Sequence, residues 1–229
     1  MPGRCGVIIN ADDFGLSEQD NRWILEGLQA GVLTSTTLMA NMPAFEEACA
    51  LASTHRLQGR IGLHFNLTYG RSLSERIRRC PRFCDAQGEF RPGLSAWTPR
   101  LTAQEAEAVR DELRTQWRRC VKAGVLPSHI DSHQHIHTLW PVGAVVAQEA
   151  RMLGVPVRQA RNLGTNLHPV KRVYKTLFNM RLRQSAVTTD WTCTPRDLLQ
   201  VRLPRQGYLE IIAHPSRSEQ GIYTDEMLG

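Results

Sequence analysis

The sequence predicts an α/β protein with a mostly parallel sheet, either open or closed into a barrel. Short apolar segments alternate along the 229 residues with segments that carry helix signals. Alternation of this kind is typical of parallel strands joined by crossover helices. The chain has no internal repeat and no low-complexity linker, and 41% of its residues are hydrophobic, which is enough for one sizeable core. We therefore expect a single domain over residues 1–229.

Six segments are expected to be strands, and most of them are short runs that are apolar or rich in β-branched residues. In chain order they are residues 5–11, 32–40, 60–67, 129–137, 155–161 and 208–215. The first is a continuous apolar run that ends in polar residues, and the second, VLTSTTLMA, is rich in threonine. The histidine-rich segment 129–137 follows a long helix and is expected to be a strand.

Five segments between these strands are expected to be helical. They are residues 17–30, 43–54, 102–123, 141–154 and 169–183. Ser17 with Asp20, and Thr102 with Glu105, have the spacing of capping boxes at helix starts. Pro43 suits the first turn of the second helix, and a glycine follows the first and third helices.

Residues 68–100 have no clear period and predict a long insertion or lid loop, because loops of this length in compact domains are often functional. The segment contains the pair Cys80 and Cys84. A structural zinc site there is disfavoured, since no second cysteine pair lies nearby. The six cysteines of the chain are scattered, and reduced thiols are expected.

The composition also bears on partners and location. The formal net charge is +6, with basic clusters at residues 71–82 and 170–183. Solvated helix faces explain these clusters better than a nucleic-acid partner, because no basic motif is interleaved with aromatic residues. The chain has no run of about 18 apolar residues, so no membrane-spanning helix is expected. The N-terminus lacks the pattern of a secretory signal. A cytoplasmic protein is expected.

Residues of the types that bind metals or transfer protons in other proteins lie near the expected carboxyl ends of the strands. They are Asp12, Asp13, His64, His129, Asp131, His133, Glu210 and His214. In a parallel sheet these ends share one rim, where ligands bind. His64 alone would more often be a core histidine, and the Asp12–Asp13 pair alone also fits a turn or a helix N-cap. Their joint placement at one rim favours a functional site.

The stretch HIDSHQHIH, residues 129–137, contains four of the eight histidines. If the strand stays regular, Asp131, His133, His135 and His137 share one face. Burying these groups is costly unless a metal or a hydrogen-bonded polar cavity compensates. Imidazole and carboxylate ligands together suit zinc and similar divalent ions. A nearby carboxylate and histidine could then act as general base and general acid.

Five motifs in order resemble the YdjC-like carbohydrate deacetylases, a family that includes chitooligosaccharide deacetylases and hopanoid-associated proteins. The motifs are NADDFGLS (10–17), VLTSTTLMAN (32–41), GLHFNLT (62–68), HIDSHQHIH (129–137) and AHPS (213–216). The resemblance covers most of the chain. It implies a distorted TIM-like (β/α) barrel and hydrolysis of an N-acetyl group from an acetylated amino sugar. It also implies one divalent metal ion, magnesium or zinc first, with nickel, cobalt and manganese as alternatives.

By match of motif, the resemblance implies that Asp13, His64 and His133 are the metal ligands. It implies that Asp12 is the general base and that His214 is the general acid or stabilises the transition state. The other candidates, expected to touch substrate or to orient the ligands, are Asp131, His135, His137, Asn66, Arg161 and Glu210. A metal-dependent phosphoesterase, another amidohydrolase and a non-enzymatic nucleic-acid or anion-binding module are the alternative functions.

The resemblance allows a homodimer, and it leaves the C-terminus as a point of difference. The chain ends at Gly229, soon after the His214–Pro215 motif. Family members commonly continue there with a further strand and helix. Either the barrel closes differently here, or the C-terminus is shortened.

Overall fold

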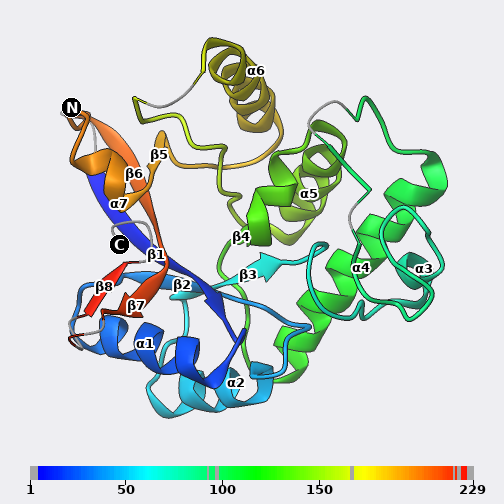
Figure 1. The fold of residues 1–229 in the computed structure, drawn as a ribbon, viewed down its shortest axis with the longest axis horizontal. Helices are drawn as coiled ribbons and strands as arrows, with labels where there is room; N and C mark the ends of the chain where they lie inside the picture. Colours follow the sequence, from blue (N-terminus) through cyan, green and yellow to red (C-terminus); the bar gives the residue numbers. More distant parts are fainter. Residues whose placement is uncertain are drawn as a thin grey trace.

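A sheet of six parallel strands forms the centre of the computed structural model, which describes residues 5–91, 93–95, 98–165, 168–218, 220 and 223–225. The strand order is β4-β3-β2-β1-β6-β5. The strands are β1 (Cys5–Phe14), β2 (Ser35–Leu38), β3 (Ile61–Phe65), β4 (Ile130–Ser132), β5 (Trp191–Cys193) and β6 (Gly207–Ala213). The sheet curls like part of a barrel, with the long helices outside it (Figure 1). The predicted α/β class and distorted TIM-like barrel are confirmed.

The helices connect successive strands, as crossover connections require. They are α1 (Glu18–Gln29), α2 (Phe45–Thr54), α3 (Glu75–Arg78), α4 (Ala103–Lys122), α5 (Trp140–Leu153), α6 (Pro169–Ser185) and α7 (Pro195–Leu198). Thr102 and Glu105 form the predicted capping box of α4, and Ser17 caps α1. The expectation that Pro43 lies in the first turn of the second helix is wrong, since α2 begins two residues later with Ala44 as its N-cap. Within the described residues, no helix is both long and apolar enough to cross a bilayer.

The segment 155–163 lies between the two edge strands of the sheet. The prediction of a strand over 155–161 is wrong in extent, because only Val157 pairs like a strand, in a parallel bridge to Ile130. Pro156 has no N–H to donate, which limits regular pairing. The backbone nevertheless bonds to both β4 and β5, from Arg158 N to Ile130 O (2.9 Å) and from Asn162 N to Thr192 O (3.1 Å). The segment therefore helps to close the barrel.

The histidine-rich segment is not a strand beyond Ser132. The backbone takes positive φ at Gln134 (49°) and His135 (55°), and η1 (His133–Thr138) is a segment of 3-10 turns that is kinked at these two residues. The expectation that Asp131, His133, His135 and His137 share one strand face is therefore wrong. Positive φ values break the alternation of side chains on which that expectation depends.

The C-terminal part contains elements that the sequence patterns did not predict. Strand β5 and helix α7 precede β6, which ends at Ala213 instead of at residue 215. The chain then forms an antiparallel pair of short strands, β7 (Pro215–Arg217) and β8 (Tyr223–Asp225). Residues 226–229, to which the expectation of a shortened C-terminus refers, lie outside the described residues.

The first part of the 68–100 segment folds against α4. Its apolar side chains Ile77, Phe83 and Phe90 are buried. The carboxylate of Glu112, on α4, accepts hydrogen bonds from the backbone N–H groups of Leu73 (3.0 Å) and Ser74 (2.6 Å). Residues 92, 96 and 97 lie outside the described residues, and a lid function stays a prediction. Cys80 and Cys84 are free thiols.

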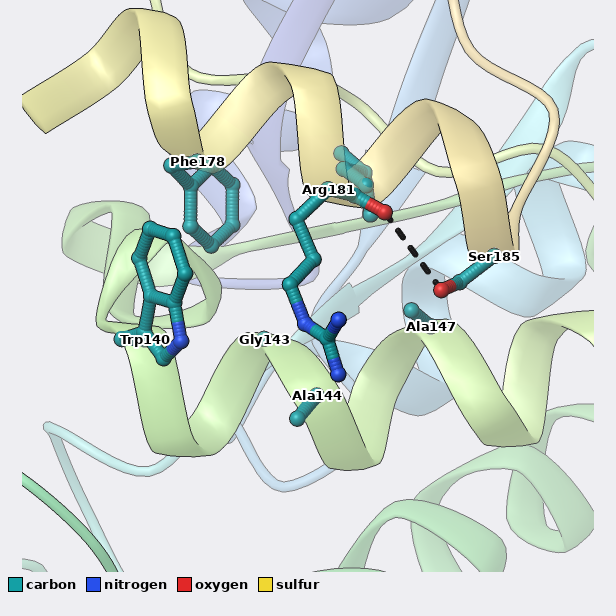
Figure 2. Close-up of a pocket in the computed structure, with 8 residues that line it drawn as sticks. Trp140, Gly143, Ala144, Ala147, Phe178, Arg181 and Ser185 are labelled. Carbon is teal, nitrogen blue, oxygen red and sulfur yellow. Dashed lines mark hydrogen bonds between the residues drawn. The ribbon is translucent and has the colours of Figure 1, made fainter.

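Helices α5 and α6 pack closely where α5 presents small side chains (Figure 2). A Cβ atom added to Gly143 would lie 2.6 Å from both the His137 carbonyl oxygen and Cε2 of Phe178. Around this glycine a groove is lined by Trp140, Ala144, Ala147, Phe178, Arg181, Leu182 and Ser185. The missing side chain therefore sets the distance between the two helices.

We expect Gly143→Ala to destabilise the protein, although alanine is the better helix former. The clash with backbone and with a buried ring should cost about 1–3 kcal/mol of unfolding free energy. Urea unfolding followed by circular dichroism checks this value. A stabilised variant would show that the helices separate without cost and would contradict the packing described here.

Candidate metal centre and active site

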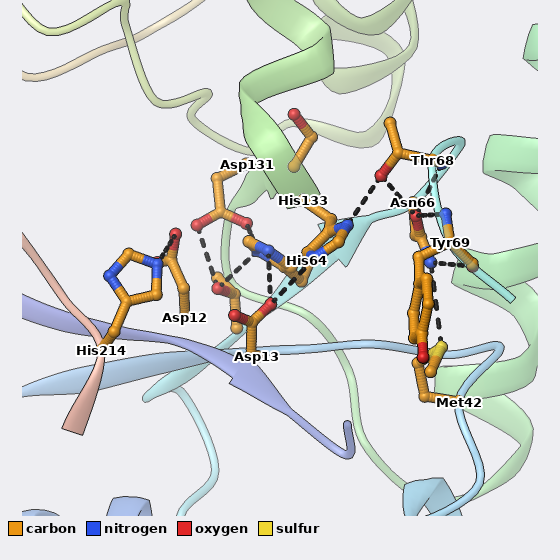
Figure 3. Close-up of polar contacts among 12 residues, drawn as sticks. Asp12, Asp13, Met42, His64, Asn66, Thr68, Tyr69, Asp131, His133 and His214 are labelled. Carbon is orange, nitrogen blue, oxygen red and sulfur yellow. Dashed lines mark hydrogen bonds and ion pairs between the residues drawn. The ribbon is translucent and has the colours of Figure 1, made fainter. Parts of the chain in front are cut away.

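Asp12 and Asp13 lie near the carboxyl end of strand β1, where the pairing register with β2 shifts. Asp13 has φ of 70°, in the left-handed region that non-glycine residues seldom adopt. In a regular strand adjacent side chains point to opposite faces. The bulge and the positive φ instead let both carboxylates reach the same rim (Figure 3). Strained backbone of this kind is concentrated at functional sites.

His64, on β3, lies between two carboxylates. Its Nδ1 is 2.7 Å from Asp131 Oδ1, and its Nε2 is 3.2 Å from Asp13 Oδ1. Asp131 lies on β4 directly beside His64 in the sheet register. Burial works to lower the pKa of His64, but the charges of Asp131 and Asp12 outweigh it and raise the pKa to about 10. In the metal-free protein the imidazole is therefore protonated at neutral pH.

Arg158 is the buried centre of the site, and the sequence patterns did not single it out. Its two terminal nitrogens each donate to one oxygen of Asp12 at 2.7 Å. The same side chain lies 2.6 Å from Asp131 Oδ2 and donates from Nε to Glu210 Oε1 at 2.6 Å. Burial opposes charge on Asp12, yet Arg158, with His64, holds the pKa of Asp12 well below its usual range.

His133 stands at the start of η1 with its Nε2 3.9 Å from Asp13 Oδ1. Its Nδ1 is 2.7 Å from the Thr68 hydroxyl, which also bonds Asn66 Oδ1 at 3.2 Å. Since that amide oxygen only accepts, Thr68 donates to it and accepts from His133 Nδ1. This assignment leaves the Nε2 lone pair of His133 directed toward Asp13. Burial lowers the pKa of His133, which favours the neutral ring.

The other predicted residues lie at different distances from this rim. His214 Nε2 is 4.0 Å from Asp12 Oδ2, and its buried Nδ1 has no hydrogen-bond partner among the residues that the structure describes. Asn66 is buried, and its amide bonds Asn41, Thr68 and Tyr69. Arg161 forms an ion pair with Asp197 at 3.1 Å. The expected sugar contacts at these two side chains stay predictions.

His137 is turned into the protein interior, away from the rim. Its Nδ1 bonds the Ser132 hydroxyl, and its Nε2 donates to the Arg158 carbonyl oxygen at 3.0 Å. Burial, with the nearby His135, lowers the pKa of His137 to about 3, so the ring is neutral in the fold. Burial also lowers the pKa of His135 to about 4. The bonds of His137 to Ser132 and to the Arg158 carbonyl hold the backbone on both sides of His133.

We expect the metal-free protein to lose stability as the pH falls from about 7 toward 4. An unfolded histidine takes up a proton near its ordinary pKa of 6.5, whereas folded His137 does so only near 3. Its contribution to stability is therefore complete above pH 6.5 and declines as the pH falls through that window. His137→Asn should flatten the slope of melting temperature against pH. Equal slopes in the two proteins would contradict the prediction.

Two groups of ligand atoms overlap at the rim. Asp12, His64 and Asp131 have ligand atoms within 4.8 Å of one another, and such a buried group could hold a metal ion. The oxygens of Asp12 already bond Arg158, however. Asp13 Oδ1 is instead buried and faces the two imidazoles, 3.2 Å from His64 Nε2 and 3.9 Å from His133 Nε2. Two ligands about 2.1 Å from a tetrahedral ion are about 3.4 Å apart.

The charges of the site also fit a cation. The pKa values of Asp12, Asp13 and Asp131 are all lowered, since charged partners outweigh the effect of burial. Three ionised carboxylates therefore face two cations, Arg158 beside Asp12 and Asp131, and the protonated His64 beside Asp13 and Asp131. A divalent ion would compensate the excess negative charge and would replace the proton of His64. The residues present thus fit a divalent metal.

Comparison with known proteins places the chain in one family. The family model of YdjC-like proteins matches residues 6–227, so the chain belongs to the YdjC-like family. It is 41% identical over 174 residues to a carbohydrate deacetylase of Geobacillus stearothermophilus, covering 76% of this chain and 66% of that relative. It is 37% identical over 158 residues to one of Clostridium beijerinckii, covering 69% and 61%. These alignments thus span somewhat less than two thirds of either relative.

Longer matches extend this picture. A chitooligosaccharide deacetylase of Klebsiella pneumoniae (strain 342) is 33% identical over 224 residues, which covers 94% of this chain and 83% of the relative. Among solved structures, a protein of Enterococcus faecalis V583 named for cellobiose-phosphate cleavage has a TM-score of 0.72 and 27% identity. That match covers 95% of this chain and 83% of the other. The fold is thus shared along nearly the whole chain.

Proposed function

We propose that this protein is a metal-dependent hydrolase that removes the N-acetyl group from an acetylated amino sugar. The observation that carries the proposal is the convergence of Asp13 Oδ1, His64 Nε2 and His133 Nε2 at the rim of the barrel. Two relatives, from Clostridium beijerinckii and Geobacillus stearothermophilus, are carbohydrate deacetylases by name. A chitooligosaccharide is the substrate class that a third relative names.

In this proposal Asp13, His64 and His133 hold the metal. Asp131 accepts the Nδ1 proton of His64, and Thr68 accepts that of His133, so both rings present Nε2 to the ion. Such outer partners fix the tautomer and orientation of metal-binding histidines. Magnesium and zinc are the first choices, and the mixture of imidazole and carboxylate ligands favours zinc. When bound, the ion would polarise the acetamide carbonyl and acidify the attacking water, which a weakly basic Asp12 requires.

Asp12 and His214 supply the proton transfers. Asp12 would accept the proton of the attacking water, and the bidentate bonds from Arg158 hold its carboxylate in one orientation. His214, 4.0 Å from Asp12 at the end of β6, would donate a proton to the departing amine. Acetate and a free amino sugar would be the products, and no covalent enzyme intermediate is required.

The test is acetate release from diacetylchitobiose by purified protein, stripped of metal and then resupplied with zinc, magnesium, nickel, cobalt or manganese in turn. We expect no release from the stripped protein and restored release with at least one ion. Release that is equal with and without metal would contradict metal dependence. Failure with every ion, in protein that binds metal and accepts no other N-acetylated sugar, would overturn the proposed reaction.

A further inference from the structure

We propose that Tyr69 forms a stacking platform for a pyranose ring of the substrate. The inference rests on the proposed function, since it names how the same site holds its sugar. Tyr69 follows β3, and 55% of its surface is exposed. Its ring centroid is 6.2 Å from that of His133, with an angle of 42° between the planes. The ring therefore stands at the open rim beside a proposed metal ligand (Figure 3).

The backbone that carries Tyr69 is fixed by two buried or half-buried amides. Asn66 Oδ1 accepts from the N–H groups of Thr68 (2.9 Å) and Tyr69 (3.2 Å). Its Nδ2 donates to the Tyr69 carbonyl oxygen at 2.7 Å, and Asn41 Nδ2 donates to the same oxygen at 3.0 Å. Asn66 itself is fully buried. Asn66 therefore shapes the turn that carries Tyr69.

The same turn connects the ring to the metal centre. Thr68 bonds His133 Nδ1 at 2.7 Å, and Tyr69 is the next residue. One asparagine therefore sets both the orientation of a proposed ligand and the position of an exposed aromatic ring. An aromatic side chain with a rigid backbone loses little entropy when it is covered. A ring left half uncovered beside a catalytic rim is an apolar surface that a ligand can bury.

A hexose ring suits this surface by its chemistry. One face of a pyranose carries mainly C–H groups, so it can cover the apolar face of tyrosine while its hydroxyl groups stay in water. An acetamide held at the metal centre would leave its sugar within reach of a ring about 6 Å from His133. The geometry thus assigns recognition of the sugar to Tyr69 and the chemistry to the neighbouring metal ligands.

The experiment compares the metal-loaded wild type with Tyr69→Ala, Tyr69→Phe and a control, Tyr208→Ala. Tyr208 is 43% exposed but lies near the start of β6, at the opposite end of the strands from the rim. We expect Tyr69→Ala to raise the KM for diacetylchitobiose about three- to tenfold, with little change in kcat or metal content. Tyr69→Phe and Tyr208→Ala should keep the wild-type KM. An unchanged KM in Tyr69→Ala, or an equal rise in Tyr69→Phe, would overturn the platform.

Calorimetric binding of chitobiose, the deacetylated disaccharide, separates this inference from the proposed reaction. If the wild type binds chitobiose and Tyr69→Ala binds it more weakly, the platform is supported even where no acetate is released. If the wild type releases acetate while chitobiose binds equally to both proteins, the reaction stands and the platform is overturned. Absence of disaccharide binding to the wild type would overturn the platform outright.

Discussion

Arg158→Met is expected to lower the free energy of unfolding by about 3–5 kcal/mol, because it leaves buried carboxylates without their cation. The guanidinium bonds Asp12, Asp131 and Glu210 at 2.6–2.7 Å, and all four side chains are buried. Removing one partner of a buried ion pair costs far more than the pair contributes to stability. Urea unfolding of the metal-free protein is the measurement.

The matched control is Arg79→Met. Arg79 also pairs with a carboxylate, Glu75, at 2.8 Å, but its side chain is 78% exposed. Its loss should change the unfolding free energy by less than about 1 kcal/mol, as for most surface ion pairs. If Arg158→Met is no more destabilising than this control, Arg158 is not the charge that holds the barrel interior together.

Two substitutions at adjacent residues should have different effects on catalysis. Asp12→Asn removes the proposed base and should lower kcat by about 10²–10⁴-fold while metal stays bound. Asp13→Asn removes a proposed ligand and should weaken metal binding by more than the about 10–100-fold that loss of an outer partner causes. The oxygens of Asp12 face Arg158, whereas Asp13 Oδ1 faces two imidazoles.

Metal content by mass spectrometry, measured alongside acetate release, separates the two variants. Circular dichroism establishes that each variant is folded, since Asp12→Asn also weakens the contact to Arg158. Near-normal turnover in Asp12→Asn would remove Asp12 from the mechanism. Loss of metal from Asp12→Asn with retention in Asp13→Asn would instead favour the group of Asp12, His64 and Asp131.

The sequence was sufficient to predict the class of fold and the rim on which the polar residues meet. Strand ends carry this information, because Asp12, His64 and Asp131 follow apolar strand residues and parallel strands end at one rim. The starts of α1 and α4 could also be predicted, because helix-cap signals depend on residues that are close in sequence. The resemblance to the family pointed to the same rim.

Long-range and strained features could not be predicted in this way. Arg158 looked like one of several basic residues, and only its burial between three acidic side chains distinguishes it. A charged residue within the apolar run VPVRQAR was the one available signal. The positive φ values of Asp13, Gln134 and His135 depend on tertiary contacts, so a period-two pattern gave the wrong faces after Ser132.

The most direct test of the account is a crystal structure of the zinc-loaded protein with anomalous diffraction data at the zinc edge. We predict one strong peak about 2.0–2.2 Å from Asp13, His64 Nε2 and His133 Nε2. Arg158 should keep both bonds to Asp12. A peak between Asp12 and Asp131 with Arg158 displaced, or no peak at this rim in protein that binds zinc, would contradict the central claim.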